Sequence, residues 1–170
     1  GFGGGQTRES RLAIMSDSRI GTYGASALGL SLILRIAALA ALLDLEGGPE
    51  TGLLWICAAP LSRMAGLLPM MLLDTAKPDG KAAQVGKASP HSFFLGLIFA
   101  LVIAVGLPLG IEKEIGPLMI ATSLALLAPW PLLHLAKKLI GGQTGDVAGA
   151  AQQLAEIAFL VILSASGPVA

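Results

Sequence analysis

Five long apolar segments constrain the fold of this chain more than any other feature. They cover residues 24–43, 53–73, 93–109, 115–135 and 148–166. A helix needs about 20 predominantly apolar residues to cross the hydrocarbon core of a bilayer. A backbone in lipid must satisfy its own hydrogen bonds, so each segment is expected to be helical. The sequence therefore predicts an all-α, polytopic integral membrane bundle with about five transmembrane helices, forming one domain over residues 1–170.

The composition agrees with a membrane protein and argues against other classes. The chain is 54% hydrophobic and only 13% charged, whereas a soluble domain carries about 25% charged residues. Its 11 basic and 11 acidic residues cancel, so no global field would attract nucleic acid. The single cysteine, Cys57, lies in an apolar segment, which excludes a disulfide within the chain and predicts a buried, inert thiol.

The basic residues indicate how the helices are oriented. Eight of them occur before the first, after the second or after the fourth apolar segment: Arg8, Arg11, Arg19, Lys77, Lys81, Lys87, Lys137 and Lys138. The other two loops carry only Lys113. Because basic loops stay in the cytoplasm, we expect a multi-pass protein of the cell inner membrane with a cytoplasmic leader over residues 1–23 and an external C-terminus.

Two polar clusters then fall on the same side of the membrane. The first, residues 14–24, contains Ser16, Asp17, Ser18, Arg19, Thr22 and Tyr23. The second, residues 141–146, precedes the last apolar segment and resembles a helix start, where free N–H groups favour an anion. Their shared side predicts a composite site. An alternative is that Asp17, Ser18 or Thr22 only caps the first membrane helix, and that Lys77 and Lys81 only set orientation.

Three charged residues are placed at membrane depth, namely Arg35, Arg63 and Glu156. Each costs a few kcal/mol there and therefore needs a partner or a role. One interpretation pairs Glu156 with Arg35 or Arg63 as a link between helices, and the other gives these charges a function. Helical spacing places Gly145, Gly149, Gln152 and Glu156 on one face, which we expect to point into the bundle.

Prolines interrupt two of the predicted helices. Pro60 and Pro69 lie in the second, and Pro129 and Pro131 lie in the fourth. Because proline removes a backbone donor and clashes with the preceding turn, kinks are expected in both helices.

Three stretches carry a resemblance to a known family. They are residues 11–24 (Arg-Leu-Ala-Ile-Met-Ser-Asp-Ser-Arg-Ile-Gly-Thr-Tyr-Gly), residues 76–80 (Ala-Lys-Pro-Asp-Gly), and residues 141–150 (Gly-Gly-Gln-Thr-Gly-Asp-Val-Ala-Gly-Ala) followed by Gln153 and Glu156. Their order and spacing resemble the cobalamin synthase family of adenosylcobinamide-GDP ribazoletransferases. The resemblance covers the C-terminal part of that family. An acidic Asp-Gly-x-Ala-Asp-x-x-Asp stretch, which such proteins carry upstream, is missing, so a fragment of a longer chain is expected.

The resemblance implies a reaction and a set of site residues. The adenosylcobinamide-phosphoryl group would pass from adenosylcobinamide-GDP to α-ribazole or its 5′-phosphate, releasing GMP with the help of Mg²⁺. It implies Asp17 and Arg19 as catalytic residues, with Asp17 also a metal ligand beside main ligands upstream. The implied substrate-binding residues are Ser18, Thr22, Lys77, Thr144 and Asp146.

Other membrane functions remain alternatives from the sequence. A CDP-alcohol type phosphotransferase would share the mechanism but would require a long, spaced Asp-rich motif, which is not found in these 170 residues. A transporter segment would place polar groups along a route to both faces, and the predicted clusters lie on one face. A non-catalytic scaffold is the third alternative. Self-association within the lipid bilayer is compatible with all of them.

Overall fold

The computed structural model describes residues 1–77, 87 and 89–166. Five helical segments in this part are long and apolar enough to cross a membrane: Thr22–Glu46, Gly48–Leu72, Pro90–Leu109, Ile115–Ile140 and Gly145–Ala165. The predicted all-α membrane bundle is thereby confirmed. Across the described residues, β structure is limited to one isolated bridge between Thr75 and Gln143.

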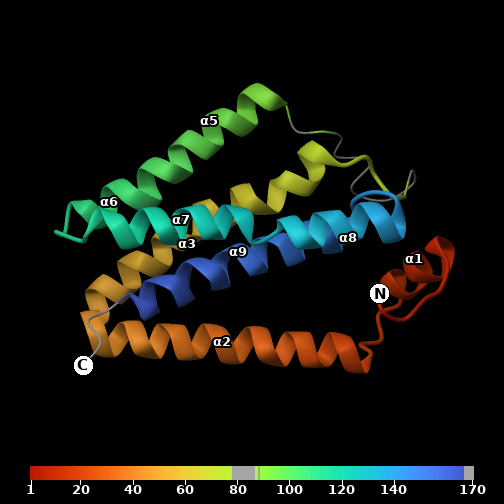
Figure 1. The fold of residues 1–170 in the computed structure, drawn as a ribbon, viewed down its shortest axis with the longest axis horizontal. Coiled ribbons are helices and arrows are strands. Elements are labelled where there is room, and N and C mark those ends of the chain that lie inside the picture. The colour runs from red at the N-terminus through yellow and green to blue at the C-terminus, as the bar shows by residue number, and fades with distance from the viewer. Residues whose placement is uncertain (78–86, 88, 167–170) are drawn as a thin grey trace.

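The helices follow one another along the chain (Figure 1). Their bounds are α1 (Arg8–Ser16), α2 (Thr22–Glu46), α3 (Gly48–Leu72), α5 (Pro90–Leu101), the π-helix η1 (Val102–Gly106), α6 (Leu107–Leu109), α7 (Ile115–Leu127), α8 (Trp130–Ile140) and α9 (Gly145–Ala165). Membrane helices extend beyond several predicted limits because polar end residues, such as Thr22 and Glu46 in α2, continue the helix outside the apolar stretch.

Helix α1 was not predicted, because the leader was expected only to precede the first membrane helix. The helix begins with a capping box, in which the Thr7 hydroxyl accepts a bond from the Ser10 backbone N–H and the Ser10 hydroxyl accepts one from Thr7 N–H. Leu12 and Met15 pack against the buried residues Ala76, Ala136, Ile140 and Val147. Tertiary packing therefore stabilises a helix too short to persist alone.

Helix α9 is the centre of the bundle and packs against α2, α3 and α7 (Figure 1). Its buried face contains Val147, Ala151, Ala155 and Phe159. At the α3 contact, a Cβ on Gly66 would lie 3.1 Å from Gln152 Cβ and 3.2 Å from the Ala148 carbonyl oxygen. Small residues permit this close packing, which supplies much of the association energy between helices in lipid.

The prediction that one polar face of α9 points into the bundle is wrong for the two glycines on that face. Gly145 and Gly149 are exposed, while Gln152 and Glu156 are half-buried. The alanine and phenylalanine face fits the neighbouring helices more closely, so shape rather than polarity decides which side of α9 is buried.

The prolines affect the helices differently. The fourth membrane segment breaks between Leu127 and Trp130, where a kink at Pro129 was predicted. By contrast, α3 continues as one helix through Pro60 and Pro69. An unpredicted π-helical turn at Val102–Gly106 comes just before Pro108. Because Pro108 has no N–H group, it cannot complete the regular hydrogen-bond pattern of that turn.

Two of the three deep charges pair inside the bundle. Arg35 Nε on α2 lies 3.2 Å from Glu156 Oε1 on α9, and both side chains are largely buried. Arg35 also donates to Gln153 Oε1, and Trp55 Nε1 on α3 donates to Glu156 over 3.4 Å. The predicted interhelical link is therefore formed by Arg35, and Arg63 is exposed on α3.

Candidate functional site

Three segments that are distant in sequence meet at the end of the bundle that carries α1 (Figure 1). Arg8 on α1 donates from Nε to the Ile140 carbonyl and from Nη2 to the Ala76 carbonyl, each over 2.9 Å. Arg8 thereby joins the leader to the end of α8 and to the segment after α3. At the other end of α1, Lys77 Nζ donates to Ser16 Oγ.

Backbone bonds fix the segment after α3 to the turn before α9. Ala76 N–H donates to Gln143 O, and Gln143 N–H donates to Asp74 O, both over 2.8 Å. Gly141 ends α8 at φ 74°, a left-handed conformation that glycine adopts without strain. A Cβ on Gly142 would lie 2.2 Å from Asp74 O. The two glycines therefore allow this tight junction.

We expect Gly142→Ala to separate the two segments. The added methyl group would overlap the Asp74 carbonyl, and relieving the overlap breaks backbone bonds at a cost of about 2 kcal/mol or more. The measurement is the thermal unfolding midpoint together with protease sensitivity of the junction. Gly145→Ala is the matched control, since nothing lies within 4 Å of a Cβ there; equal behaviour of the two variants would contradict this account.

The N-terminus of α9 opens at this junction. Thr144 is buried and caps the helix, its hydroxyl accepting a bond from Val147 N–H over 3.4 Å. Asp146 lies exposed in the first turn. The predicted helix start is confirmed, three residues earlier than the apolar segment suggested. The positive end of the α9 dipole therefore points toward the junction, where it favours anions.

Asp17 and Arg19 form a local, exposed ion pair just after α1. Arg19 Nη2 donates to Asp17 Oδ2 over 2.8 Å, and Arg19 Nε lies 3.2 and 3.1 Å from the two carboxylate oxygens. These bonds hold the pKa of Asp17 below its usual value and raise that of Arg19. The capping alternative is wrong for this cluster, because α2 begins after Gly21 with no side-chain cap.

The ion pair predicts a pH dependence. Because Arg19 lowers the folded pKa of Asp17 from its ordinary value of 3.8, the ion pair persists as pH falls to that ordinary value and is lost as pH falls through the lowered pKa. We expect Arg19→Gln to move the Asp17 titration upward, toward its ordinary value. Carbon-13 NMR of a labelled Asp17 carboxylate would measure it, with Arg11→Gln as the control that leaves the titration unchanged. An unmoved titration in Arg19→Gln would contradict the pairing.

The structure brings together some of the predicted site residues. Lys77 reaches the Asp17 cluster through Ser16, and the backbone bridge links its segment to Thr144. Among the described residues, no hydrogen bond or ion pair joins Asp17 to Thr144 or Asp146. The side chains of Ser18 and Thr22 are exposed and make no hydrogen bond within this same part of the chain. Residues 78–80 of the second recognised stretch, and Lys81, lie outside the described residues.

Two residues at the junction were missed as site components. Gln143 is only 4% exposed, and its Oε1 has no donor among the residues that the structure describes. This buried acceptor could take a bond from a ligand hydroxyl or amine. Arg8 was counted only as an orientation charge. Gln143 stood within a recognised motif, but nothing in the sequence indicated its burial.

The described residues do not form a metal site by themselves. In this part of the chain, no group of three or more His, Cys, Asp or Glu side chains is arranged to hold an ion. Asp17 contributes one carboxylate, already bonded to Arg19. Basic side chains are plentiful at the same end, and Arg19 and Lys137 are exposed. These exposed basic side chains suit phosphate oxygens.

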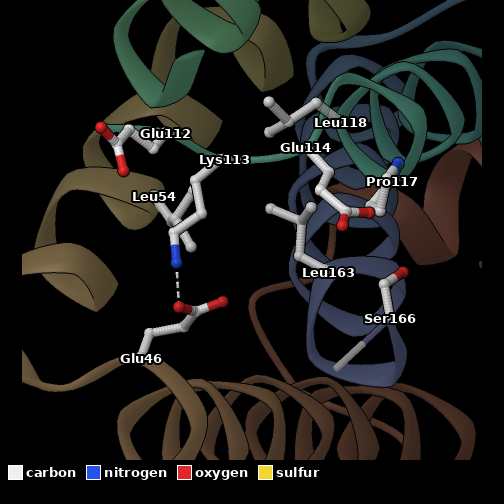
Figure 2. A pocket seen from close by; sticks show the side chains of 9 residues that line it. All are labelled: Glu46, Leu54, Glu112, Lys113, Glu114, Pro117, Leu118, Leu163 and Ser166. Carbon is white, nitrogen blue, oxygen red and sulfur yellow. Dashed lines mark hydrogen bonds and ion pairs between the residues drawn. The ribbon is translucent and has the colours of Figure 1, made fainter. Parts of the chain in front are cut away.

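A cavity of about 490 Å³ lies at the opposite end of the bundle (Figure 2). Its wall includes Glu112, Glu114 and an ion pair between Lys113 and Glu46. Because the loop over residues 110–114 lies far from α1 in Figure 1, this cavity is separate from the junction.

Comparison with known proteins assigns the chain to a family. The family described as cobalamin-5-phosphate synthase (CobS) matches residues 1–164. The adenosylcobinamide-GDP ribazoletransferase of Azorhizobium caulinodans is 46% identical over 165 residues, which are 95% of this chain and 60% of that protein. The protein of the same description from Bradyrhizobium diazoefficiens is 44% identical over 167 residues, 97% of this chain and 60% of the relative. No solved structure matches. The chain thus spans about 60% of the length of these curated relatives, and it belongs to the cobalamin-5-phosphate synthase family.

Proposed function

We propose that this chain provides the membrane-embedded part of an adenosylcobinamide-GDP ribazoletransferase. The reaction joins adenosylcobinamide-GDP to α-ribazole, or to its 5′-phosphate, and gives adenosylcobalamin, or its phosphate, together with GMP. The observation that carries the proposal is the meeting of the three recognised segments at one end of the bundle. Arg8, the Ser16–Lys77 contact and the backbone bonds of Gln143 with Asp74 and Ala76 hold them there.

The chemistry is a displacement at phosphorus. A hydroxyl oxygen of α-ribazole attacks the phosphorus bonded to the cobinamide, the bond to the bridging oxygen breaks, and GMP leaves with that oxygen while the hydroxyl proton is released. Such transfers depend on in-line positioning and on neutralising charge, more than on covalent chemistry by the protein.

The residues of the junction have matching roles in the proposal. Arg19 stabilises charge on the bridging phosphates, with its guanidinium oriented by Asp17. Lys77 makes a second phosphate contact. Ser18, between α1 and α2, and Thr22, at the start of α2, bind substrate. Thr144 and Asp146 do so from the start of α9, where free backbone N–H groups favour an anion.

Magnesium enters the proposal as a second requirement. Mg²⁺ would neutralise phosphate charge, and it is commonly held by one or two carboxylates together with substrate phosphates. Asp17 could supply one ligand. Because the described residues hold no cluster of three candidate ligands, the main ligands are proposed to lie outside them.

The orientation follows from the loop charges. We place the junction, with its basic residues, on the cytoplasmic side of the inner membrane, and the cavity of Figure 2 with its three glutamates on the outside. Both substrates would then reach the junction from the cell interior.

The test is product formation in membranes that contain the protein. With adenosylcobinamide-GDP, α-ribazole and Mg²⁺, we expect GMP and adenosylcobalamin in equal amounts, and chelation of Mg²⁺ should stop both. The assay should compare this 170-residue chain with a full-length relative. If only the relative is active, the short chain lacks a required part, and the proposed reaction still stands. Absence of product from both, in membranes where insertion has been verified, would contradict the proposal.

A further inference from the structure

Arg63 lies on the exposed side of α3, inside a helix that is long and apolar enough to cross a membrane. In the stretch from Thr51 to Gly66, the exposed positions are Trp55, Ile56, Ala59 and Arg63, and the others are buried or half-buried. Arg63 makes no ion pair or side-chain hydrogen bond with any residue that the structure describes. An arginine facing lipid at this depth costs at least a few kcal/mol.

The geometry of α3 does not let Arg63 reach water easily. The helix rises about 13 Å from Arg63 to its end at Leu72. Side chains lean toward the N-terminus of their own helix, and in α3 this direction leads away from the nearer end. Snorkelling to the near interface would therefore work against the natural direction of the side chain.

The exposed stripe that carries Arg63 adjoins other polar and small residues. Trp55, at the same stripe, donates to Glu156 on α9. Close packing between Gly66 and Gln152 brings the polar part of α9 to the level of Arg63. Gly145 and Gly149 are exposed on α9, and nothing lies within 4 Å of a Cβ at either position. Small residues at such spacing allow another helix to approach closely.

We propose that this face of α3 and α9 is covered by a further transmembrane helix that carries an aspartate or glutamate at the depth of Arg63. The charge of Arg63 requires an acidic partner, and the uncovered glycines admit a helix backbone. The helix lies outside residues 1–170, which agrees with the greater length of the curated relatives.

A second copy of this chain would not meet the same requirement. Glu156 is the carboxylate at membrane depth among the described residues, and Arg35 already holds it. Two copies packed face to face would therefore bring two Arg63 side chains together with no free acid between them. Lipid alone would leave the charge without a partner.

The first test is photocrosslinking in cells that produce the protein at natural levels. A photoreactive amino acid replaces Ala59 beside Arg63 or, as the matched control, Ile98, which is 57% exposed on α5. We expect position 59 to crosslink to a membrane-spanning peptide outside residues 1–170 that contains an acidic residue, and position 98 to label lipid. Lipid adducts alone at position 59, or crosslinks there to a second copy of residues 1–170, would overturn the proposal.

The second test measures whether replacing Arg63 lowers or raises the unfolding midpoint in membranes of the same cells, which contain the proposed helix. If a carboxylate pairs with Arg63, Arg63→Leu leaves that acid uncompensated and lowers the unfolding midpoint, and Arg63→Lys restores most of it. If Arg63 faces lipid, Arg63→Leu removes an exposed charge and leaves the midpoint unchanged or raised. That second outcome would reject the acidic helix, whether or not the protein is a ribazoletransferase.

Discussion

Replacing Glu156 with glutamine should lower the free energy of unfolding by about 3–5 kcal/mol, because the change leaves the positive charge of Arg35 uncompensated in the bundle. Arg35 Nε lies 3.2 Å from Glu156 Oε1, and the two side chains are only 17% and 15% exposed. The pair also joins α2 to the central helix α9. Since most of the α2 surface is exposed, this link is expected to contribute much of its attachment. Thermal unfolding in nanodiscs would measure the loss.

The double variant Arg35→Gln with Glu156→Gln provides the decisive comparison. It removes both charges, so we expect it to be more stable than Glu156→Gln alone, with a coupling energy of about 0.5–3 kcal/mol. Glu112→Gln, in the exposed loop between α6 and α7, is the control and should change stability by no more than about 0.5 kcal/mol. If Glu156→Gln alone is as stable as the wild type, the ion pair does not hold α2.

Replacing Asp17 with asparagine should lower turnover by roughly 10²-fold or more, as the loss of one aligned electrostatic contact does in other active sites. Asparagine keeps the shape of the side chain but removes the charge that orients Arg19 through three side-chain bonds. It also removes the single carboxylate that this cluster could offer to Mg²⁺. Because the pair is exposed, membrane insertion and the unfolding midpoint should remain unchanged.

The rate of GMP release at saturating substrate measures this effect. Glu9→Gln is the matched control, because it removes another exposed carboxylate from the leader and should keep nearly full turnover. Near-normal turnover in Asp17→Asn would reject the catalytic assignment of Asp17 and would leave Lys77 and the start of α9 as the main phosphate contacts.

The candidate site was predictable as a set of segments but not as a set of contacts. The motifs around Asp17, Lys77 and Thr144 stood out because polar residues are dense there and because their order and spacing resemble the family. The sequence did not reveal that Asp17 bonds to Arg19, that Arg8 joins three segments, or that Gln143 is buried. Asp17 and Arg19 are close in sequence, but their spacing alone does not decide whether the two side chains meet. The contact of Arg8 with Ile140 joins residues 132 positions apart, which no local pattern reports.

The sequence by itself determined the class of fold, because length and hydropathy decide whether a helix can span a bilayer, and these are properties of each segment alone. It also identified the residues that needed partners, since a charge in an apolar segment is costly wherever the helices pack. Only the tertiary structure decided that Arg35 rather than Arg63 meets Glu156, that alanines rather than glycines of α9 face the core, and that the leader forms a docked helix. Those choices depend on how the surfaces of whole helices fit together, and many alternative packings would satisfy the same pattern of apolar residues.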